Sequence, residues 1–173
     1  MYHMSRTLPI GLLVFLVCGL VVAKYTIYTD VFAPRVLTVS VFNVGKGTAT
    51  LIRAPSGRAI LVDTGSDASI LRSLGSSLPM WDRSLDAVIL TGASSKVTGG
   101  LPDIQKRYRI AQILRADGRA IPYGTSLTFD KTIPLTVIAP QTFTVSSGSA
   151  TLLISSSTSP GTYISNGTFF LHK

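Results

Sequence analysis

Hydrophobic and polar residues alternate along much of the chain after residue 35, and this pattern predicts short strands. In Val36–Phe42 every second residue is apolar, as in a strand with one buried face. Glycine- or proline-containing turns at 45–47 and 55–57 separate this segment from Thr48–Arg53 and Arg58–Asp63. The three segments predict an antiparallel meander.

A helix is expected next. The apolar residues of Ala68–Leu74 have helical spacing, with Asp67 placed to cap the start and Gly75 to end it. The segments that follow are predicted to be a buried strand, a helix opened by two glycines and a short strand, in the order Asp86–Thr91, Gly99–Tyr108 and Ile110–Leu114.

The pattern after Gly118 is that of β-structure only. A Ser- and Thr-rich stretch, 142–159, has the composition of a mucin-type linker, but the apolar run Leu152–Ile154 inside it favours a strand between loose loops. The strands predicted in this half are Ser126–Phe129, Ile133–Ile138, Ala150–Ser155 and Thr168–Leu171. The fold class expected from the whole pattern is α/β (α+β).

The N-terminal part is apolar. Leu8–Ala23 contains no charged residue, and with the residues up to Tyr28 it reaches the length of a helix that crosses a layer of about 30 Å. We therefore predict a short tail at 1–7, a transmembrane signal anchor at 8–28 and a linker at 29–35. The alternative is a cleaved signal peptide, for which Val21 fits the small-residue cleavage pattern poorly.

The anchor prediction places the protein in the cell membrane as a single-pass protein. Its short N-terminal tail favours a globular domain outside the cytoplasm. Cys18 lies inside the apolar segment and follows Val17, where a lipid attachment site needs a small residue. We interpret Cys18 as a packing or lipid-facing thiol.

The composition limits the chemistry of the chain. All eight acidic residues are Asp, and the two histidines, His3 and His172, lie near opposite ends. The single cysteine excludes a disulfide and a cysteine-based zinc site within one copy. No cofactor and no metal are expected.

The formal charge of +8 favours anionic partners such as nucleic acid or acidic lipid. Tyr108 lies within a basic stretch, whose alternative interpretation is a solvated helix face followed by a strand. The candidate anion-binding residues are Lys46, Lys106, Arg107, Arg109 and Arg115.

Three further segments were considered for chemistry. The segment 45–48 resembles the end of a phosphate-binding loop, but Ser40 stands where that loop needs a glycine. Asp63 ends an apolar strand and is expected to accept backbone hydrogen bonds in the turn that follows. Ser94 or Ser95 with Lys96 could form a nucleophile pair, although a solvated loop at 92–98 is the simpler interpretation.

Four segments, in this order and spacing, resemble the metallo-β-lactamase-like domain of ComEC-type DNA-uptake proteins. They are Leu37–Leu51 (LTVSVFNVGKGTATL), Ile60–Gly65 (ILVDTG), Trp81–Leu90 (WDRSLDAVIL) and the Gly99-Gly100-Leu101-Pro102 run. The resemblance covers residues 36–173. It implies a partial αββα sandwich, truncated at its C-terminal half and preceded by the transmembrane helix.

The sequence departs from the family where the family binds metal. The family's Asp-Val-Gly-Gln-Gly-Asp turn has Asn43, Lys46 and Thr48 at its polar places here. The family's His-x-Asp-x-Asp-His loop is represented by Gly92, Ser94, Lys96 and Val97, which we interpret as a degenerate former metal loop. The motif residues that remain are Asp63, Gly65, Gly99 and Gly100.

These departures imply a bacterial pseudoenzyme of the hydrolase family, because a catalytic zinc needs about three protein ligands. The expected function is a membrane-anchored, non-catalytic module for binding or scaffolding, linked to DNA uptake (competence) or secretion. The alternative is a nucleic-acid-binding or relic hydrolase domain of a DNA-uptake system. Expected partners are the membrane, other membrane proteins or a second copy, and weakly bound nucleic acid.

Overall fold

The computed structural model describes residues 11–12, 14–22, 36–130, 133–165 and 168–172. Residues 11–12 and 14–22 are helical and exposed, and Cys18 is among them. Within the described residues, no helix combines the length and the apolar character needed to cross a membrane. The predicted anchor and linker lie partly or wholly outside these residues and stay predictions.

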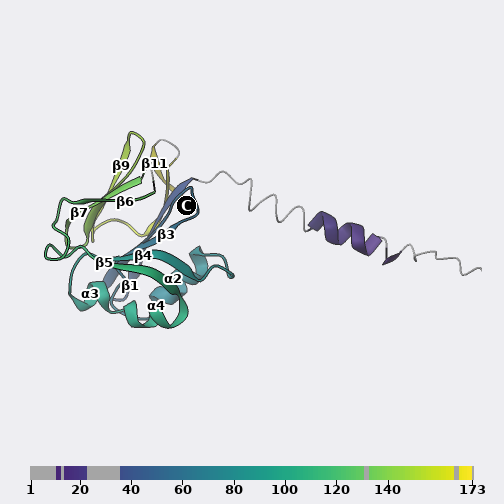
Figure 1. Ribbon diagram of the computed structural model, residues 1–173, viewed down its shortest axis with the longest axis horizontal. Helices are drawn as coiled ribbons and strands as arrows, with labels where there is room; N and C mark the ends of the chain where they lie inside the picture. The colour runs from purple at the N-terminus through teal and green to yellow at the C-terminus, as the bar shows by residue number, and fades with distance from the viewer. Residues whose placement is uncertain (1–10, 13, 23–35, 131–132, 166–167, 173) are drawn as a thin grey trace, which may run out of the picture. The chain divides into compact units, whose positions relative to one another are not determined.

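The chain divides into two units, Met1–Arg35 and Val36–Lys173. The second unit is a mixed α+β fold with two sheets, which Figure 1 shows as separate layers. In the described part of the chain the larger sheet has seven strands in the order β11-β10-β1-β2-β3-β4-β5. Their bounds are β1 Leu37–Val44, β2 Gly47–Arg53, β3 Ala59–Val62, β4 Ser84–Leu90, β5 Arg109–Arg115, β10 Gly161–Ser165 and β11 Phe169–His172.

The predicted meander is confirmed. Strands β1, β2 and β3 pair antiparallel, with Thr38 opposite Arg53 and Arg53 opposite Ala59. Strands β4 and β5 then extend the sheet in parallel with β3, so the sheet is mixed. All three parallel strands end at one edge of the sheet, which we call the Asp63 edge after the residue that follows β3.

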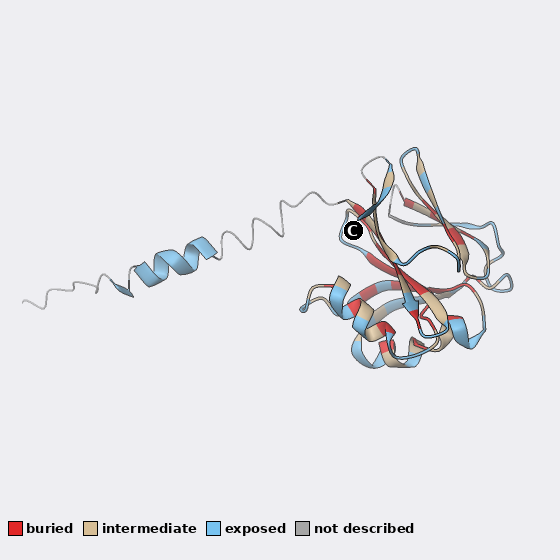
Figure 2. Cartoon of the chain, turned by 180° about the vertical axis from the view of Figure 1, so that it is seen from behind, coloured by how far each residue is buried: buried red, intermediate tan, exposed pale blue. Residues whose placement is uncertain are grey.

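Helices cover one face of the larger sheet, and the smaller sheet covers the other (Figure 1). The helices are α2 Ile70–Ser77, α3 Ser95–Thr98 and α4 Leu101–Arg107. Ile70, Leu74 and Ile104 from α2 and α4 are fully buried against sheet residues such as Leu61 and Val88. In Figure 2 the buried residues run along the strands and the inner sides of the helices.

The smaller sheet has the order β6-β7-β8-β9 among the described residues. Its strands are β6 Ser126–Asp130, β7 Ile133–Ala139, β8 Thr142–Ser147 and β9 Ala150–Ile154. Alternate residues of β7 and β8 face the larger sheet, and Leu135, Val137, Phe143 and Val145 are buried there. The described residues thus form a helical layer and two sheets, and no described helix covers the outer side of the smaller sheet.

The prediction of loose loops around Ala150–Ser155 was wrong for residues 142–147, which form β8. Phe143 and Val145 alternate with Thr142 and Thr144 there, so the strand has a buried face. Threonine is β-branched and suits a half-buried strand, and the Ser- and Thr-rich composition hid this period. Strand β10 was also missed, since Gly161–Ser165 has no strong apolar alternation.

Two expectations for the helices were also wrong. Gly75 lies inside α2 rather than at its end, and the helix continues to Ser77. The position is exposed, so the helix needs no packed side chain there. Residues 95–98 form the short helix α3 instead of a loop; Val97 is its buried residue, while Ser95 and Lys96 are exposed. The helix expected after Gly99-Gly100 is confirmed as α4.

Candidate functional site

The Asp63 edge brings together three loops: the β1–β2 turn, the turn after β3, and the segment from Thr91 to Gly100 after β4. The carboxyl ends of parallel strands meet at one edge of a sheet, and sites are commonly built from the loops there. The sequence predicted Asp63 and the 92–97 segment as candidates, and the structure places them side by side. Thr64 N–H donates to the carbonyl of Val97 at 2.8 Å.

Asp63 is buried, and both of its carboxylate oxygens are engaged by Thr91. The Thr91 N–H donates to Oδ1 at 2.8 Å and the Thr91 hydroxyl donates to Oδ2 at 2.8 Å. The backbone of Asp63 has a φ of 57°, a left-handed conformation that costs free energy for a residue with a Cβ atom. Its N–H donates to Ile89 O at 2.8 Å, which ties it to β4.

The environment of Asp63 favours its neutral form. Burial raises the pKa of the Asp63 carboxyl to about 6, and the hydrogen bonds from Thr91 act in the opposite direction. Only 3% of the residue is exposed, so a substrate has no direct access to it.

Thr91 is the center of a hydrogen-bond network that the sequence analysis did not identify. Its hydroxyl oxygen accepts a bond from Gln141 N–H at 2.8 Å, and its carbonyl accepts one from the Tyr123 hydroxyl at 3.3 Å. Gln141 is the other described non-glycine residue with positive φ, at 55°. A threonine at the end of an apolar run was the available signal for Thr91, whereas nothing in the sequence marks Gln141.

The retained glycines have packing roles at this edge. A Cβ atom on Gly99 would collide with the carbonyl of Ser66, and one on Gly100 with the carbonyl of Thr64. Gly65 has a φ of 71° and lies directly against Val44. These glycines allow the loops to approach each other at backbone distance, a structural use that requires no ligand.

The 92–97 segment is part of the packed frame. Val97 is buried, and its carbonyl also accepts the Thr64 hydroxyl at 2.8 Å. Gly92 is half-buried beside Val97 and Pro140. Ser94 and Lys96 are exposed, so this segment presents hydroxyl and ammonium groups to solvent.

The residues at the edge do not fit the zinc that the family resemblance implies. Among the residues that the structure describes, no three His, Cys, Asp or Glu side chains lie close enough to hold a metal ion. Asp63 uses both oxygens on Thr91, and the exposed ammonium of Lys96 would repel a cation.

The candidate anion-binding residues fall into two groups. Lys46 lies in the β1–β2 turn at the Asp63 edge, and Arg115 ends β5 opposite Leu90 at that edge. Arg109 begins β5, and Lys106 and Arg107 precede it at the end of α4. The two ends of β5 are about 20 Å apart, so a small ligand cannot contact both groups at once.

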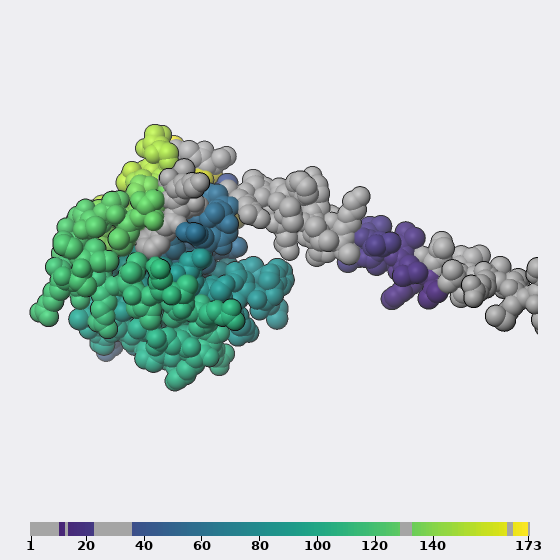
Figure 3. Space-filling view, in the orientation of Figure 1, coloured from purple at the N-terminus to yellow at the C-terminus, as the bar shows by residue number. Residues whose placement is uncertain are grey.

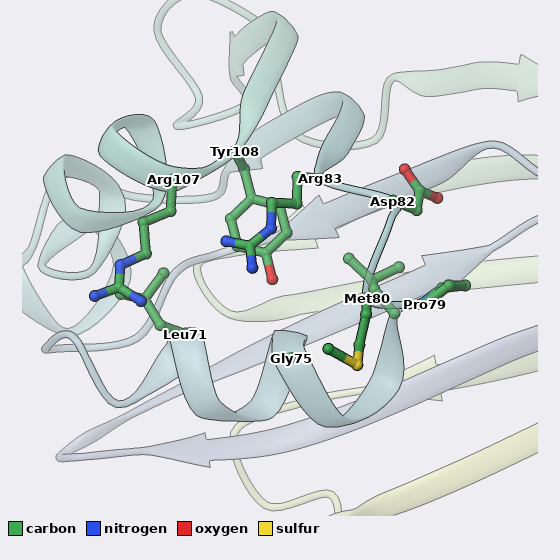
Figure 4. A pocket seen from close by; sticks show the side chains of 9 residues that line it. Leu71, Gly75, Pro79, Met80, Asp82, Arg83, Arg107 and Tyr108 are labelled. Carbon is green, nitrogen blue, oxygen red and sulfur yellow. The ribbon is translucent and has the colours of Figure 1, made fainter.

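A hollow of about 160 Å³ lies away from the Asp63 edge (Figure 4). It lies among α2, the end of α4 and the turn before β4, and the sequence analysis did not identify it. Its lining includes Leu71, Gly75, Met80, Arg83, Arg107 and Tyr108.

Comparisons with known proteins find similarities among solved structures, two of which follow. No protein-family model matches the chain, and no curated protein matches it. A metallo-β-lactamase from Hirschia baltica is similar at 14% identity and a TM-score of 0.39, over 68% of this chain and 65% of that one. The peroxy diiron species of the chemotaxis sensor ODP is similar at 15% identity and a TM-score of 0.40, over 66% and 55%. The chain thus spans less than two thirds of both proteins, and neither similarity identifies its family.

Proposed function

We propose that this chain is a membrane-anchored, non-catalytic binding or scaffolding module with a metallo-β-lactamase-like fold. The observation that carries the proposal is the engagement of Asp63 by Thr91. A general base or a metal ligand needs an oxygen that faces the substrate or the ion. Both Asp63 oxygens instead accept bonds from one residue of the same frame.

The side chains that the Asp63 edge presents are suited to binding. Lys46, Ser94 and Lys96 are exposed there, and they come from two loops in backbone contact. A Cβ atom on Gly47 would collide with the carbonyl of Lys96, which shows how closely these loops approach. Ammonium and hydroxyl groups held on a rigid edge can recognise an anionic or polar partner without performing chemistry.

The membrane part of the proposal rests on the uncharged run Leu8–Ala23. Its link to DNA uptake or secretion, with a domain outside the cytoplasm, rests on the sequence resemblance alone. Carbonate extraction of membranes from cells that produce the full chain tests the anchor. We expect the protein to stay in the pellet, and release at alkaline pH would contradict an anchor.

Hydrolysis assays test the non-catalytic part. The purified full chain is incubated with a p-nitrophenyl phosphodiester and with a chromogenic β-lactam, each with added zinc or manganese. We expect no turnover above that of the metal-containing buffer. Turnover that rises with metal and disappears in Asp63→Asn would show that the edge is a working site.

Nucleic-acid binding is the second candidate, favoured by the positions of Lys46, Lys96 and Arg115 at one edge. Asp67 lies against Gly45, next to Lys46, and Asp117 lies near Arg115. Retention on immobilised DNA should fall as salt rises, and Lys46→Gln with Lys96→Gln should reduce the slope by about 2. Lys106→Gln with Arg109→Gln is the control of equal charge. Retention that is independent of salt would exclude phosphate binding.

A partner on the smaller sheet is consistent with a scaffolding role. Ile138 and Leu153 are 47% and 57% exposed on β7 and β9. Sizing of the detergent-extracted full chain tests self-association as one form of such pairing. A clean monomer would exclude a stable second copy.

A further inference from the structure

One turn of the domain exposes two large hydrophobic side chains next to each other. The N–H of Asp82 donates to Pro79 O at 3.0 Å, so Met80 and Trp81 occupy the two middle positions of a tight turn. Met80 is 86% exposed and Trp81 is 77% exposed. Neither side chain is buried in the domain, so packing within the domain does not explain why they stand in this turn.

The turn lies at the end of the domain where the chain enters it. Strand β1 begins at Leu37, and its next residue, Thr38, is paired with Arg53. The Arg53 guanidinium donates to the carbonyl of Ser77 at 3.4 Å, and Ser77 ends α2 immediately before the turn. In Figure 3 the teal segment that contains α2 projects from the body of the domain.

Basic side chains surround the same turn. Arg83 follows it, and Arg83, Arg107 and Tyr108 line the adjacent hollow (Figure 4). Both arginines are exposed, and neither has an ion pair within the part of the chain that the structure describes. Of the nearby acids, Asp82 accepts bonds from Ser84 and Asp103 pairs with Lys106.

We propose that this surface, made of Met80, Trp81, Arg83 and Arg107, docks on an anionic lipid bilayer. Tryptophan and methionine side chains enter the boundary between headgroups and acyl chains, and arginines beside them bind lipid phosphates. Tyr108 lines the hollow between the arginines and adds a hydroxyl donor. A soluble anion would use the arginines but leave the exposed Met80–Trp81 pair without a role.

The proposal rests on the proposed membrane anchor. A linker of seven residues, 29–35, reaches at most about 25 Å. A tether of this length keeps the end of the domain at Leu37 within reach of the bilayer. The Asp63 edge lies at the opposite ends of the strands.

Trp81 is the only tryptophan of the chain, and it reports the docking directly. The full chain is reconstituted in vesicles of phosphatidylcholine alone or with phosphatidylglycerol, with and without brominated acyl chains. Flotation of the vesicles at alkaline pH, which releases peripherally bound protein, measures the anchor, and Trp81 emission at neutral pH measures the surface. We expect a blue-shifted emission, quenched by brominated lipid, in the anionic vesicles and much less in the zwitterionic ones.

Charge variants test the role of the arginines. Arg83→Gln with Arg107→Gln should lower the docking equilibrium about 30-fold. Arg115→Gln with Arg119→Gln removes the same charge elsewhere and should leave Trp81 emission unchanged. Met80→Asp should reduce the quenching while Trp81 is retained.

The outcomes separate the two proposals. If the protein floats with the vesicles at alkaline pH but Trp81 is quenched in neither the zwitterionic nor the anionic vesicles, the docking surface is overturned and the anchor stands. Protein that does not float at alkaline pH but whose Trp81 responds to anionic vesicles at neutral pH supports the surface without the anchor, and the absence of any Trp81 response overturns the surface. A response to inorganic phosphate at matched ionic strength, without one to vesicles, assigns the arginines to a soluble anion and also overturns the proposal.

Discussion

Asp63 and Thr91 form a closed pair: the N–H and the hydroxyl of Thr91 each donate at 2.8 Å to one oxygen of the buried Asp63 carboxylate. The pair joins the ends of the neighbouring strands β3 and β4, and Gln141 connects it to the smaller sheet through the Thr91 hydroxyl. Asp63 therefore stabilises the junction of the two sheets.

Asp63→Asn should change how stability depends on pH. The folded-state pKa of Asp63 is raised to about 6, above an unfolded value of about 3.9, so the folded state binds more protons between these values. The stability of the native sequence relative to the variant should therefore fall as pH rises from about 4 to 6, by about 3 kcal/mol, and then stay level.

Urea denaturation of both proteins at several pH values measures this difference. The asparagine keeps the size of the side chain and an oxygen for the Thr91 N–H but does not titrate. The comparison therefore isolates the effect of ionisation from that of packing. A difference in the free energy of unfolding that does not change with pH would contradict a raised pKa.

Thr91→Val should destabilise the junction. The substitution removes the hydroxyl donor of Asp63 and the acceptor of the Gln141 N–H, and a buried polar group left without a partner costs about 1–3 kcal/mol. The pKa of Asp63 should also rise further, because a hydrogen bond to the carboxylate is lost. Thr91→Ser keeps the hydroxyl and should keep most of the stability. A loss in Thr91→Ser with none in Thr91→Val would show that the methyl group matters instead.

Gly100→Ala and Gly75→Ala should have opposite effects on stability. A Cβ atom at Gly100 would lie 2.8 Å from Ile70 Cγ2 and 2.9 Å from Asp67 O, and would collide with Thr64 O, so this variant should unfold more easily. Gly75 lies within α2 with nothing within 4 Å of the added atom. Alanine there should stabilise the helix by about 0.5–1 kcal/mol. Thermal denaturation compares the two, and destabilisation by Gly75→Ala would contradict its placement inside α2.

The sequence predicted the parts of the fold that depend on local patterns. The meander β1–β3 follows from apolar alternation and glycine turns, and α4 follows from the Gly99-Gly100 start. Strand β8 was missed because Ser and Thr concealed the alternation of Phe143 and Val145. Gly75 was misplaced because a glycine in an exposed helix position resembles a helix end.

The candidate site was predictable in its residues but not in its contacts. Asp63 and the 92–97 segment were identified from a strand end and a family pattern. The bonds of Thr91 to Asp63, Gln141 and Tyr123 join residues 28 to 50 positions apart, and only the folded sheet brings them together. Likewise, Arg107 and Arg109 lie near the start of β5 and Arg115 lies at its end, so the extended strand keeps them apart.

Titration of the full chain with zinc, followed by calorimetry, tests the central claim that Asp63 belongs to the frame and serves no ion. The native protein and Asp63→Asn should give superimposable isotherms, since any weak binding elsewhere on the chain is common to both. Stoichiometric zinc binding in the native protein that is lost in Asp63→Asn would show that the Asp63 edge is a metal site and would contradict the proposal.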